Sequence, residues 1–255
     1  MSLLQLIIIA TLQGFTEWLP ISSSAHVLLA SGYFGLEGHD ELLINAVSNL
    51  GTLAAMLLYF RKDVASAVIG GFELLAVAAG YEKLLPEHIQ TTLRGPATVA
   101  GATIVFGALL WWADVKGGRE RKEEDMTLLH AFLIGATQAV AAIIPGTSRS
   151  GITMTAARAL GYERSEAARF AMLIGAPILA AAGLYGALGL MGESAGGVVT
   201  LQDGMIVAGV AFITGLASIA ALMAILQRMS FLPFVLYRFA LGIALILMSP
   251  TIGLF

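Results

Sequence analysis

Long apolar runs separated by short polar segments dominate this sequence. Six runs come close to the roughly 17–25 residues with which a helix crosses a bilayer: 42–60, 64–80, 96–113, 169–191, 203–225 and 231–249. No polar stretch between them is long enough for a separate soluble domain. The pattern therefore predicts an all-α integral membrane protein with a single membrane domain over residues 1–255.

Two stretches outside these runs share one plan. In each, a Gln lies seven residues before a Pro, an apolar pair precedes the Pro, and a hydroxyl-rich run follows it. The matching residues, Gln13 with Gln138 and Pro20 with Pro145, are separated by the same 125 positions. Polar and ionisable groups are costly in hydrocarbon, so such clusters in an apolar chain indicate a functional site. Because the plan repeats, we expect the two stretches to form two halves of one site.

The positions of Lys and Arg predict the orientation of the spans. The positive-inside rule places four short basic segments in the cytoplasm: Arg61 and Lys62; Lys116, Arg119, Arg121 and Lys122; Arg164 and Arg169; and Arg228. The spans of the first half then run opposite to those of the second, which gives inverted repeats at approximately 1–125 and 126–255. The crossings agree with the sides assigned to the basic segments only if residues 1–41 begin and end outside the membrane, and residues 127–165 begin and end inside.

The sequence thus predicts an inverted-topology repeat of six full transmembrane helices plus two re-entrant helical hairpins, with both termini outside. Non-helical backbone is tolerated at membrane depth only where it is buried in protein or lines a cavity. We therefore expect the breaks in the two hairpins to line a substrate site. Many secondary transporters share this plan, so transport is a rival interpretation.

The first hairpin offers a carboxylate and several hydroxyls. Gln13 and Glu17 lie one turn apart on the same helix face, where they can hold one ligand or one metal ion between them. Pro20 disfavours helical backbone at the preceding residue and so ends the first helix. A new helix follows and runs through His26. The N-cap candidates for this helix are Ser22, Ser23 and Ser24.

The second hairpin repeats the break. Pro145 and Gly146 interrupt the helix, Thr147 or Ser148 can cap the next one, and Arg149 stands at its mouth. Helix N-termini, a guanidinium and hydroxyls that converge on one point indicate a cradle for phosphate or diphosphate. The predicted substrate-binding residues are Ser22, Ser24, Gly146, Thr147, Ser148 and Ser150.

Composition supports the membrane assignment and excludes several other classes. Hydrophobic residues make up 58% of the chain, charged residues 12%, and the mean hydropathy is +0.85. The absence of cysteine excludes disulfides, iron–sulfur clusters and thiolate zinc sites. Basic residues lie in short loops rather than on one face or in a tail, so no nucleic acid partner is expected.

Other polar residues have plainer interpretations. Arg238 either extends its side chain to the cytoplasmic face or contacts the site. Glu17 could be no more than a structural ion-pair partner of Arg149, which would still place the two together. Glu73 is a carboxylate in mid-span without an assigned role. Three histidines in or beside predicted loops are expected to be solvated or structural: His39, His88 and His130. Five glycines indicate close helix packing: Gly101, Gly107, Gly175, Gly183 and Gly186.

The two hairpin motifs closely resemble the signature motifs of the undecaprenyl pyrophosphate phosphatase family, the bacitracin-resistance proteins of bacterial membranes. The motifs are Gln13-x-x-x-Glu17 with Pro20-Ile-Ser-Ser-Ser-Ala-His26, and Pro145-Gly-Thr-Ser-Arg-Ser-Gly151. The resemblance implies removal of the terminal phosphate of undecaprenyl diphosphate, which regenerates the lipid carrier for cell-envelope polymers. It also implies a bacterial inner membrane, a site facing the periplasm, and dependence on Mg²⁺ or Ca²⁺.

The resemblance implies catalytic roles for the acidic motif, the histidine and the arginine. We expect Glu17, Ser23, His26 and Arg149 to be catalytic and to meet, with Ser148, in one pocket. The sequence leaves three candidates for the nucleophile. We favour the Ser23 hydroxyl, assisted by His26 or Glu17. The other two are His26 itself and a water activated by Glu17. A cation would lie against the phosphates at the predicted metal ligands, Gln13 and Glu17. Position 13 is Gln where many members carry Glu, which leaves one carboxylate ligand fewer.

The expected partners are a polyprenyl diphosphate lipid and the surrounding membrane lipids. The lipid chain should leave sideways between helices, so the site should be laterally open. A homodimer is one option for the oligomeric state, which the sequence leaves open. The alternative function is a flippase or transporter of a polyprenyl phosphate lipid, since an inverted repeat suits alternating access.

Overall fold

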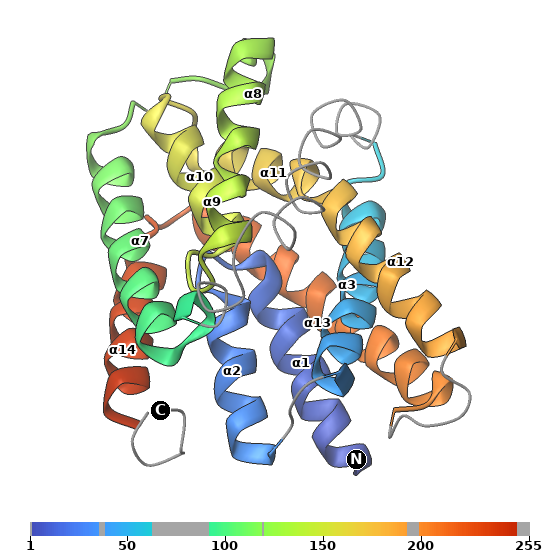
Figure 1. The fold of residues 1–255 in the computed structure, drawn as a ribbon. Coiled ribbons are helices and arrows are strands. Elements are labelled where there is room, and N and C mark those ends of the chain that lie inside the picture. Colours follow the sequence, from blue (N-terminus) through green and yellow to red (C-terminus); the bar gives the residue numbers. More distant parts are fainter. Residues whose placement is uncertain (1, 36–38, 63–91, 119, 193–198, 249–255) are drawn as a thin grey trace.

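A computed structural model describes residues 2–35, 39–62, 92–118, 120–192 and 199–248 of the chain (Figure 1). Within these ranges the secondary structure is helical, with one isolated β-bridge between Arg121 and Tyr162. The elements are α1 Leu3–Trp18, α2 Ser23–Phe34, α3 His39–Tyr59, α7 Pro96–Lys116, the 3₁₀ helix η1 Glu123–Asp125, α8 Leu128–Ala136, α9 Gln138–Ile143, α10 Arg149–Ala159, α11 Arg164–Ile174, α12 Ala176–Gly192, α13 Leu201–Leu226 and α14 Leu232–Met248.

The predicted all-α class is confirmed for the described residues. Three helical stretches are long and apolar enough to cross a membrane: Pro96–Lys116, Arg164–Met191 and Leu201–Leu226. The predicted spans at 42–60 and 231–249 correspond to shorter apolar helices, Leu43–Tyr59 and Leu232–Met248. The predicted span at 64–80 lies outside the described residues, as do Glu73 and His88.

The first hairpin breaks where proline chemistry requires it. Helix α1 ends at Trp18, and Leu19 is extended, with φ −73° and ψ 145°, because Pro20 disfavours helical backbone at the residue before it. Ser22 then takes a left-handed conformation, with φ 71°, and α2 begins at the next residue. The break thus reverses the chain within four residues, 19–22.

The second hairpin uses the same chemistry. Ile144, before Pro145, is extended with φ −116° and ψ 98°. Ser148 has φ 69°, and its Oγ accepts a hydrogen bond of 3.1 Å from the backbone N of Gly151, so Ser148 is the N-cap of α10. Ser22 and Ser148 are the two non-glycine residues with positive φ within the described ranges. Both breaks therefore place a serine in a strained conformation just before a helix.

The two hairpins enter the molecule from opposite ends. Helix α1 begins and α2 ends at the lower end of the view, whereas α8 begins and α10 ends at the upper end (Figure 1). The breaks of both hairpins lie near the middle and contact each other there, since the backbone N of Gly146 donates to Ser24 Oγ at 3.1 Å. Helices α3, α7, α12, α13 and α14 pack around them, with α13 against α1 and α3, and α14 against α7.

Arg238 on α14 ties the two breaks together. Its side chain is fully buried and donates only to backbone carbonyls: Nε to Thr103 at 2.9 Å, Nη1 to Pro20 at 3.4 Å, and Nη2 to Gly146 and Thr147 at 3.0 Å each. The expectation that Arg238 extends to the cytoplasmic face is therefore wrong. The carbonyls that the helix breaks leave unpaired need a donor inside the protein, and this guanidinium supplies it.

The glycines expected at helix crossings have mixed roles. A Cβ at Gly186 would lie 2.6 Å from the Cβ of Ala46, and one at Gly183 would lie 2.5 Å from Leu50 Cδ2, so both allow α12 to approach α3 closely. Gly101 has nothing within 4 Å of the corresponding position. Gly175, between α11 and α12, faces a functional side chain and is described below.

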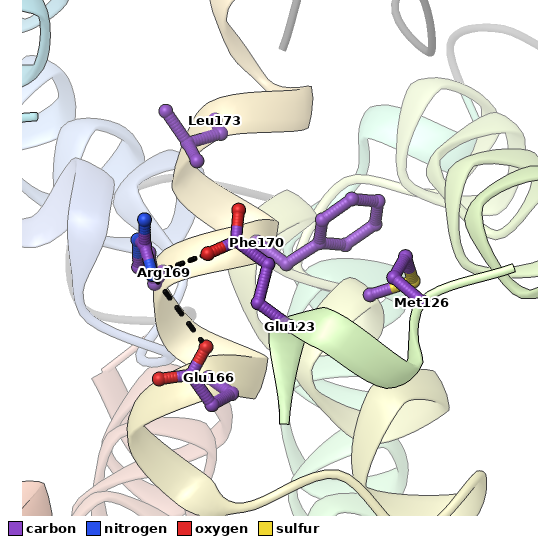
Figure 2. A pocket seen from close by; sticks show the side chains of 6 residues that line it. All are labelled: Glu123, Met126, Glu166, Arg169, Phe170 and Leu173. Atoms are coloured by element: carbon purple, nitrogen blue, oxygen red, sulfur yellow. Dashed lines mark ion pairs between the residues drawn. The ribbon is translucent and has the colours of Figure 1, made fainter. Parts of the chain in front are cut away.

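A polar network joins the helix ends at the upper end of the fold. The carboxylate of Asp114 on α7 accepts hydrogen bonds from Arg158 at 3.0 Å, from Arg164 at 2.8 and 3.1 Å, and from the backbone N of Phe231 at 3.2 Å. Figure 2 shows the adjoining contact, in which Arg169 of α11 pairs with Glu123 of η1. The basic residues predicted to share one side of the membrane are thus partly engaged with acidic groups.

We predict that Arg238→Met lowers the free energy of unfolding by roughly 3–5 kcal/mol, because several carbonyls lose their only charged donor and the breaks lose their common anchor. Thermal or denaturant unfolding of purified protein in detergent measures the change. Arg228→Met is the matched control, since Arg228 is exposed and should change stability by less than about 0.5 kcal/mol. Equal stability of the two variants would contradict the anchoring role of Arg238.

Candidate active site

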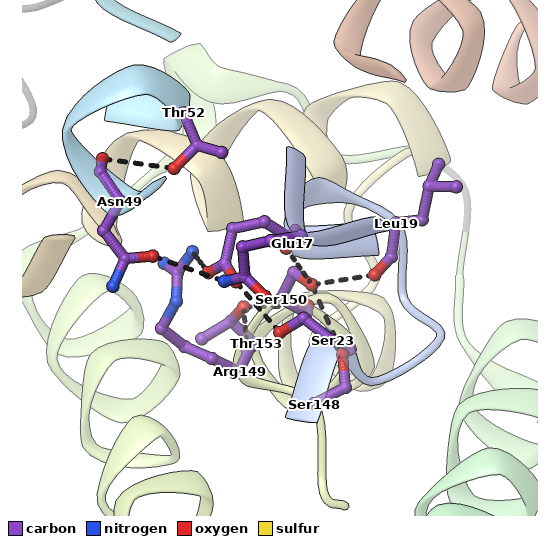
Figure 3. A network of polar contacts seen from close by, with 11 residues as sticks. Glu17, Leu19, Ser23, Asn49, Thr52, Ser148, Arg149, Ser150 and Thr153 are labelled. Carbon is purple, nitrogen blue, oxygen red and sulfur yellow. Dashed lines mark hydrogen bonds and ion pairs between the residues drawn. The ribbon is translucent and has the colours of Figure 1, made fainter. Parts of the chain in front are cut away.

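Glu17 is the centre of the contacts between the two hairpins (Figure 3). Its Oε1 accepts a hydrogen bond of 2.9 Å from Arg149 Nη2, which also forms an ion pair with it. Its Oε2 accepts from Ser23 Oγ at 2.9 Å and from Gln13 Nε2 at 3.0 Å. Gln13 Nε2 also lies 3.4 Å from Asn49 Oδ1 on α3. The carboxylate is thus oriented by a hydroxyl, an amide and a guanidinium.

Serines of both hairpins form hydrogen bonds that join the backbones of the two hairpins next to Glu17. Ser150 Oγ, at the start of α10, lies 3.2 Å from the carbonyl oxygen of Glu17 and 3.1 Å from that of Leu19, and donates to them. Ser22 Oγ and Ser24 Oγ are 3.1 Å apart, and Ser24 Oγ accepts from the backbone N of Gly146. Much of the hydroxyl content of the motifs therefore serves the junction between the hairpins.

A cavity of about 280 Å³ opens beside the Glu17 centre. Its polar lining comes from both hairpins and from α3: Gln13, Glu17, Ser23, Ser24, Asn49, Gln138, Ser148 and Arg149. Ile178, Leu179 and Ala182 of α12 provide an apolar wall. A charged donor, several hydroxyls and a carboxylate in a partly enclosed space can bind and act on an anionic group.

Arg149 lines this cavity and has one donor without a partner. Its Nη2 is bonded to Glu17, and its guanidinium lies over the Trp18 ring, with 5.5 Å from Cζ to the ring centroid. Its Nη1 is buried without a hydrogen-bond partner. A buried charged donor that lacks a partner is costly, so the arrangement favours an anionic ligand that would accept from Nη1.

Gly175 leaves the space that Arg149 occupies. A Cβ at Gly175 would lie 1.4 Å from Arg149 Nη1, which is closer than any side chain could come without displacing the guanidinium. The glycine that the sequence suggested for helix packing thus gives room to the candidate catalytic arginine at the junction of α11 and α12.

His26 lies apart from the other candidate catalytic residues. Its Nδ1 donates to the carbonyl of Ser22 at 2.8 Å, and its Nε2 lies 2.7 Å from the hydroxyl of Tyr237 on α14. The ring lines a separate, largely apolar groove beside Leu12 and Leu29. The expectation that His26 shares one pocket with Glu17, Ser23, Ser148 and Arg149 is therefore wrong, because α2 turns this face toward α14, whereas the other four residues do line one cavity.

The predicted substrate-binding residues divide into two groups. Ser24, Gly146 and Ser148 line the cavity. Ser22 and Thr147 are fully buried, and Thr147 Oγ1 donates to the carbonyl of Ile144 at 2.7 Å. Ser22, Thr147 and Ser150 are not among the cavity's lining residues. Two further polar residues line the cavity and were not among the predicted site residues: Asn49 and Gln138. For Gln138 the signal was present, because it stands 125 positions after Gln13.

The donor set for a cation is small. Among the residues that the structure describes, no three His, Cys, Asp or Glu side chains gather in a group that could hold a metal ion. The carboxylate and amide oxygens at the cavity come from Glu17 and from Gln13, Asn49 and Gln138. Mg²⁺ and Ca²⁺ prefer such hard oxygen ligands. With one carboxylate, the set fits a cation that takes its other ligands from phosphate oxygens and water.

Comparisons with known proteins match this chain along nearly its whole length. Residues 6–244 match the family described as bacitracin resistance protein BacA. A protein of Hyphomonas neptunium named undecaprenyl-diphosphatase is 63% identical, with 99% of each chain covered. Proteins of the same name from Maricaulis maris and Jannaschia are 43% and 38% identical, and cover 96% and 98% of this chain and 98% and 99% of their own.

We predict that Gly175→Ala weakens the binding of inorganic diphosphate by about tenfold or more, because the added methyl group displaces Arg149 from the cavity. The shift of the thermal unfolding midpoint with diphosphate concentration measures the affinity. Gly209→Ala is the matched control, since a Cβ there meets nothing within 4 Å. If Gly175→Ala binds diphosphate as well as Gly209→Ala does, Arg149 is not the anion contact.

Proposed function

We propose, since the chain belongs to the BacA family of bacitracin resistance proteins, that it hydrolyses undecaprenyl diphosphate to undecaprenyl phosphate and inorganic phosphate. Full-length relatives named undecaprenyl-diphosphatase support hydrolysis and do not favour the alternative, a flippase or transporter of the lipid. The reaction would return the lipid carrier to the synthesis of cell-envelope polymers. The chain is accordingly a multi-pass membrane protein with a lipid substrate.

One observation at the site carries this proposal. Arg149, which lines the cavity, donates from one hairpin to Glu17 of the other through Nη2, while its buried Nη1 has no hydrogen-bond partner. A guanidinium binds phosphate oxygens through paired, planar donors. Hydrolysis of a phosphoanhydride depends mainly on holding the diphosphate in place and offsetting the charge that develops in the transition state. Arg149 is placed for both tasks.

Ser23 is the nucleophile that the contacts support best. Its Oγ donates to Glu17 Oε2 at 2.9 Å, so the carboxylate can accept the hydroxyl proton as Oγ attacks the terminal phosphorus. The bond between that phosphorus and the bridging oxygen breaks, and undecaprenyl phosphate leaves. Water then hydrolyses the phosphoserine to inorganic phosphate. Ser148 and Ser24, which line the same cavity, would bind the phosphate oxygens.

For His26 we propose a positioning role. Its Nδ1–H holds the carbonyl of Ser22, the residue with left-handed backbone that immediately precedes Ser23. Tyr237 fixes the other side of the ring through Nε2. His26 would therefore affect turnover by setting the conformation of the break that presents Ser23, and Glu17 would serve as the base.

A divalent cation forms part of the proposal. We propose that Mg²⁺ or Ca²⁺ enters with the diphosphate and is held on the protein side by Glu17 and the amide oxygen of Gln13. Such a cation supplies charge neutralisation at the phosphate oxygens. Because Gln13 contributes no charge, most of the ligands would belong to the substrate and to water.

The proposed topology is an inverted repeat in the bacterial inner membrane, with the site open toward the periplasm. Two features support it: the hairpins enter from opposite ends (Figure 1), and two of the four basic segments, those of Arg121 and of Arg164 with Arg169, are joined at one end through Asp114, Glu123 and the Arg121–Tyr162 bridge. The positive-inside rule would place that end in the cytoplasm.

We predict that Arg149→Ala lowers the rate of phosphate release from undecaprenyl diphosphate by roughly two to three orders of magnitude, equivalent to about 3–4 kcal/mol of transition-state stabilisation. Arg149→Lys should be almost as slow, because Lys keeps the charge but loses the planar pair of donors. Purified protein in detergent, assayed for released inorganic phosphate, provides the measurement. Rescue by Lys would reduce Arg149 to a counter-ion of Glu17, and wild-type protein that releases no phosphate would refute the proposed function.

The topology is tested by cysteine labelling, since the chain has no native cysteine. Cysteines introduced singly at Ser2 and at Gly118 should react with a membrane-impermeant thiol reagent from opposite sides of inner-membrane vesicles, Ser2 from the periplasmic side. Both positions are exposed in the fold, so each can be labelled. Labelling of both from the same side would contradict the inverted orientation.

A further inference from the structure

Gln138, the first residue of α9, is a buried amide without a protein partner. Its side chain is 1% exposed, and neither Nε2 nor Oε1 forms a hydrogen bond. Leaving both atoms of a buried amide unpaired costs several times the net value of a hydrogen bond. The residue nevertheless lines the cavity that Glu17 and Arg149 share. An amide kept in this state at a cavity indicates a ligand that completes its hydrogen bonds.

Comparison with Gln13 explains why the amide is free. Gln13 donates to Glu17, four residues later on the same helix face. At the equivalent position of the second half, four residues after Gln138, the chain has Ala142. Ala142 removes the partner and leaves room, and it lines the cavity together with Ala141. The second half therefore keeps the glutamine of the repeat but leaves its amide without an intrahelical partner, in a residue that lines the cavity.

Arg149, which lines the same cavity, has the second donor without a partner, its buried Nη1. Two buried donors without partners, one charged and one neutral, are suited to the non-bridging oxygens of a phosphoryl group. Gln138 also presents an acceptor, Oε1, which suits a bound water or the hydroxyl of a protonated phosphate. An apolar ligand would satisfy neither the donors nor the acceptor.

We propose that Gln138 is a substrate-binding residue whose Nε2 donates to a phosphoryl oxygen of the diphosphate and whose Oε1 accepts from a water or a phosphate hydroxyl beside it. The proposal rests on the proposed function and names a contact within that site. It assigns to the second hairpin a neutral phosphate contact in addition to Arg149.

The first arm of the test is stability without ligand. Gln138→Met replaces the amide with an apolar side chain of similar length, and because no protein bond is lost, the unfolding midpoint should be unchanged or higher. Gln13→Met is the matched comparison: it removes bonds to Glu17 and Asn49, so its midpoint should be lower. A fall of the midpoint in Gln138→Met equal to that in Gln13→Met, or failure of Gln138→Met to fold, would assign Gln138 a structural role and overturn the proposal.

The second arm is phosphate binding. Gln138→Met should raise the KM for a prenyl diphosphate, and the concentration of inorganic phosphate that gives half-maximal thermal stabilisation, by about tenfold each. Gln138→Glu, of the same size but negatively charged, should weaken both further. Changes below about twofold in both variants would overturn the proposal.

The two proposals fail separately. Stabilisation by inorganic phosphate needs no turnover, so it decides the role of Gln138 even if wild-type protein releases no phosphate from the lipid. Conversely, wild-type activity with unaltered KM in both Gln138 variants would refute the contact at Gln138 alone.

Discussion

The fold depends on satisfying two helix breaks inside an apolar protein. Each break frees backbone carbonyls that are buried away from water, and an unpaired carbonyl there costs several kcal/mol. Arg238 supplies donors to Pro20 of one break and to Gly146 and Thr147 of the other, and it binds Thr103 of α7 as well. Because one guanidinium serves both breaks, the two hairpins are held in contact. The side chains next to the breaks, Ser23 and Arg149 among them, take their positions from this contact.

The arrangement of Arg238 at the two breaks also sets the balance of charge around the site. The partners of Arg238 are carbonyl oxygens, which carry no net charge, whereas Arg149 pairs with the carboxylate of Glu17. Two guanidinium groups and one carboxylate therefore surround the meeting point of the breaks. Buried positive charge in excess is unfavourable until an anion shares the space. A diphosphate would supply that anion, so the interaction that holds the hairpins together also favours the binding of the proposed substrate.

Local chemistry made part of this arrangement predictable from the sequence. The ends of both broken helices follow from Pro20 and Pro145, and the cap at Ser148 follows from its place before Arg149, because such effects act over a few residues. The pairing of Glu17 with Arg149 was predictable because an ionised group in an apolar chain needs a partner. The directions of His26 and Arg238 were not, since both depend on how α14 packs against α2 and α7, with contacts formed across more than 90 residues of sequence. The sequence spacing on α2 suggested that His26 lies beside Ser23. In the structure, the packing of α2 against α14 directs His26 to Tyr237 instead.

The two halves of the site are alike in backbone but differ in charge. Before the breaks, at positions 125 residues apart, Glu17 corresponds to Ala142. After the breaks Ser22 is equivalent to Ser148, since both have positive φ and directly precede a helix, so Ser23 corresponds to Arg149. The first hairpin thus provides the carboxylate and the hydroxyl that it orients, and the second provides the guanidinium and an amide without an intrahelical partner. A transport site that opens alternately to both sides gains from similar halves, because the ligand must bind comparably in both states. A hydrolytic site needs a base and a cation at different atoms of one substrate. The divergence of charge between the two hairpins therefore favours a single hydrolytic centre over a transport site that opens alternately to both sides.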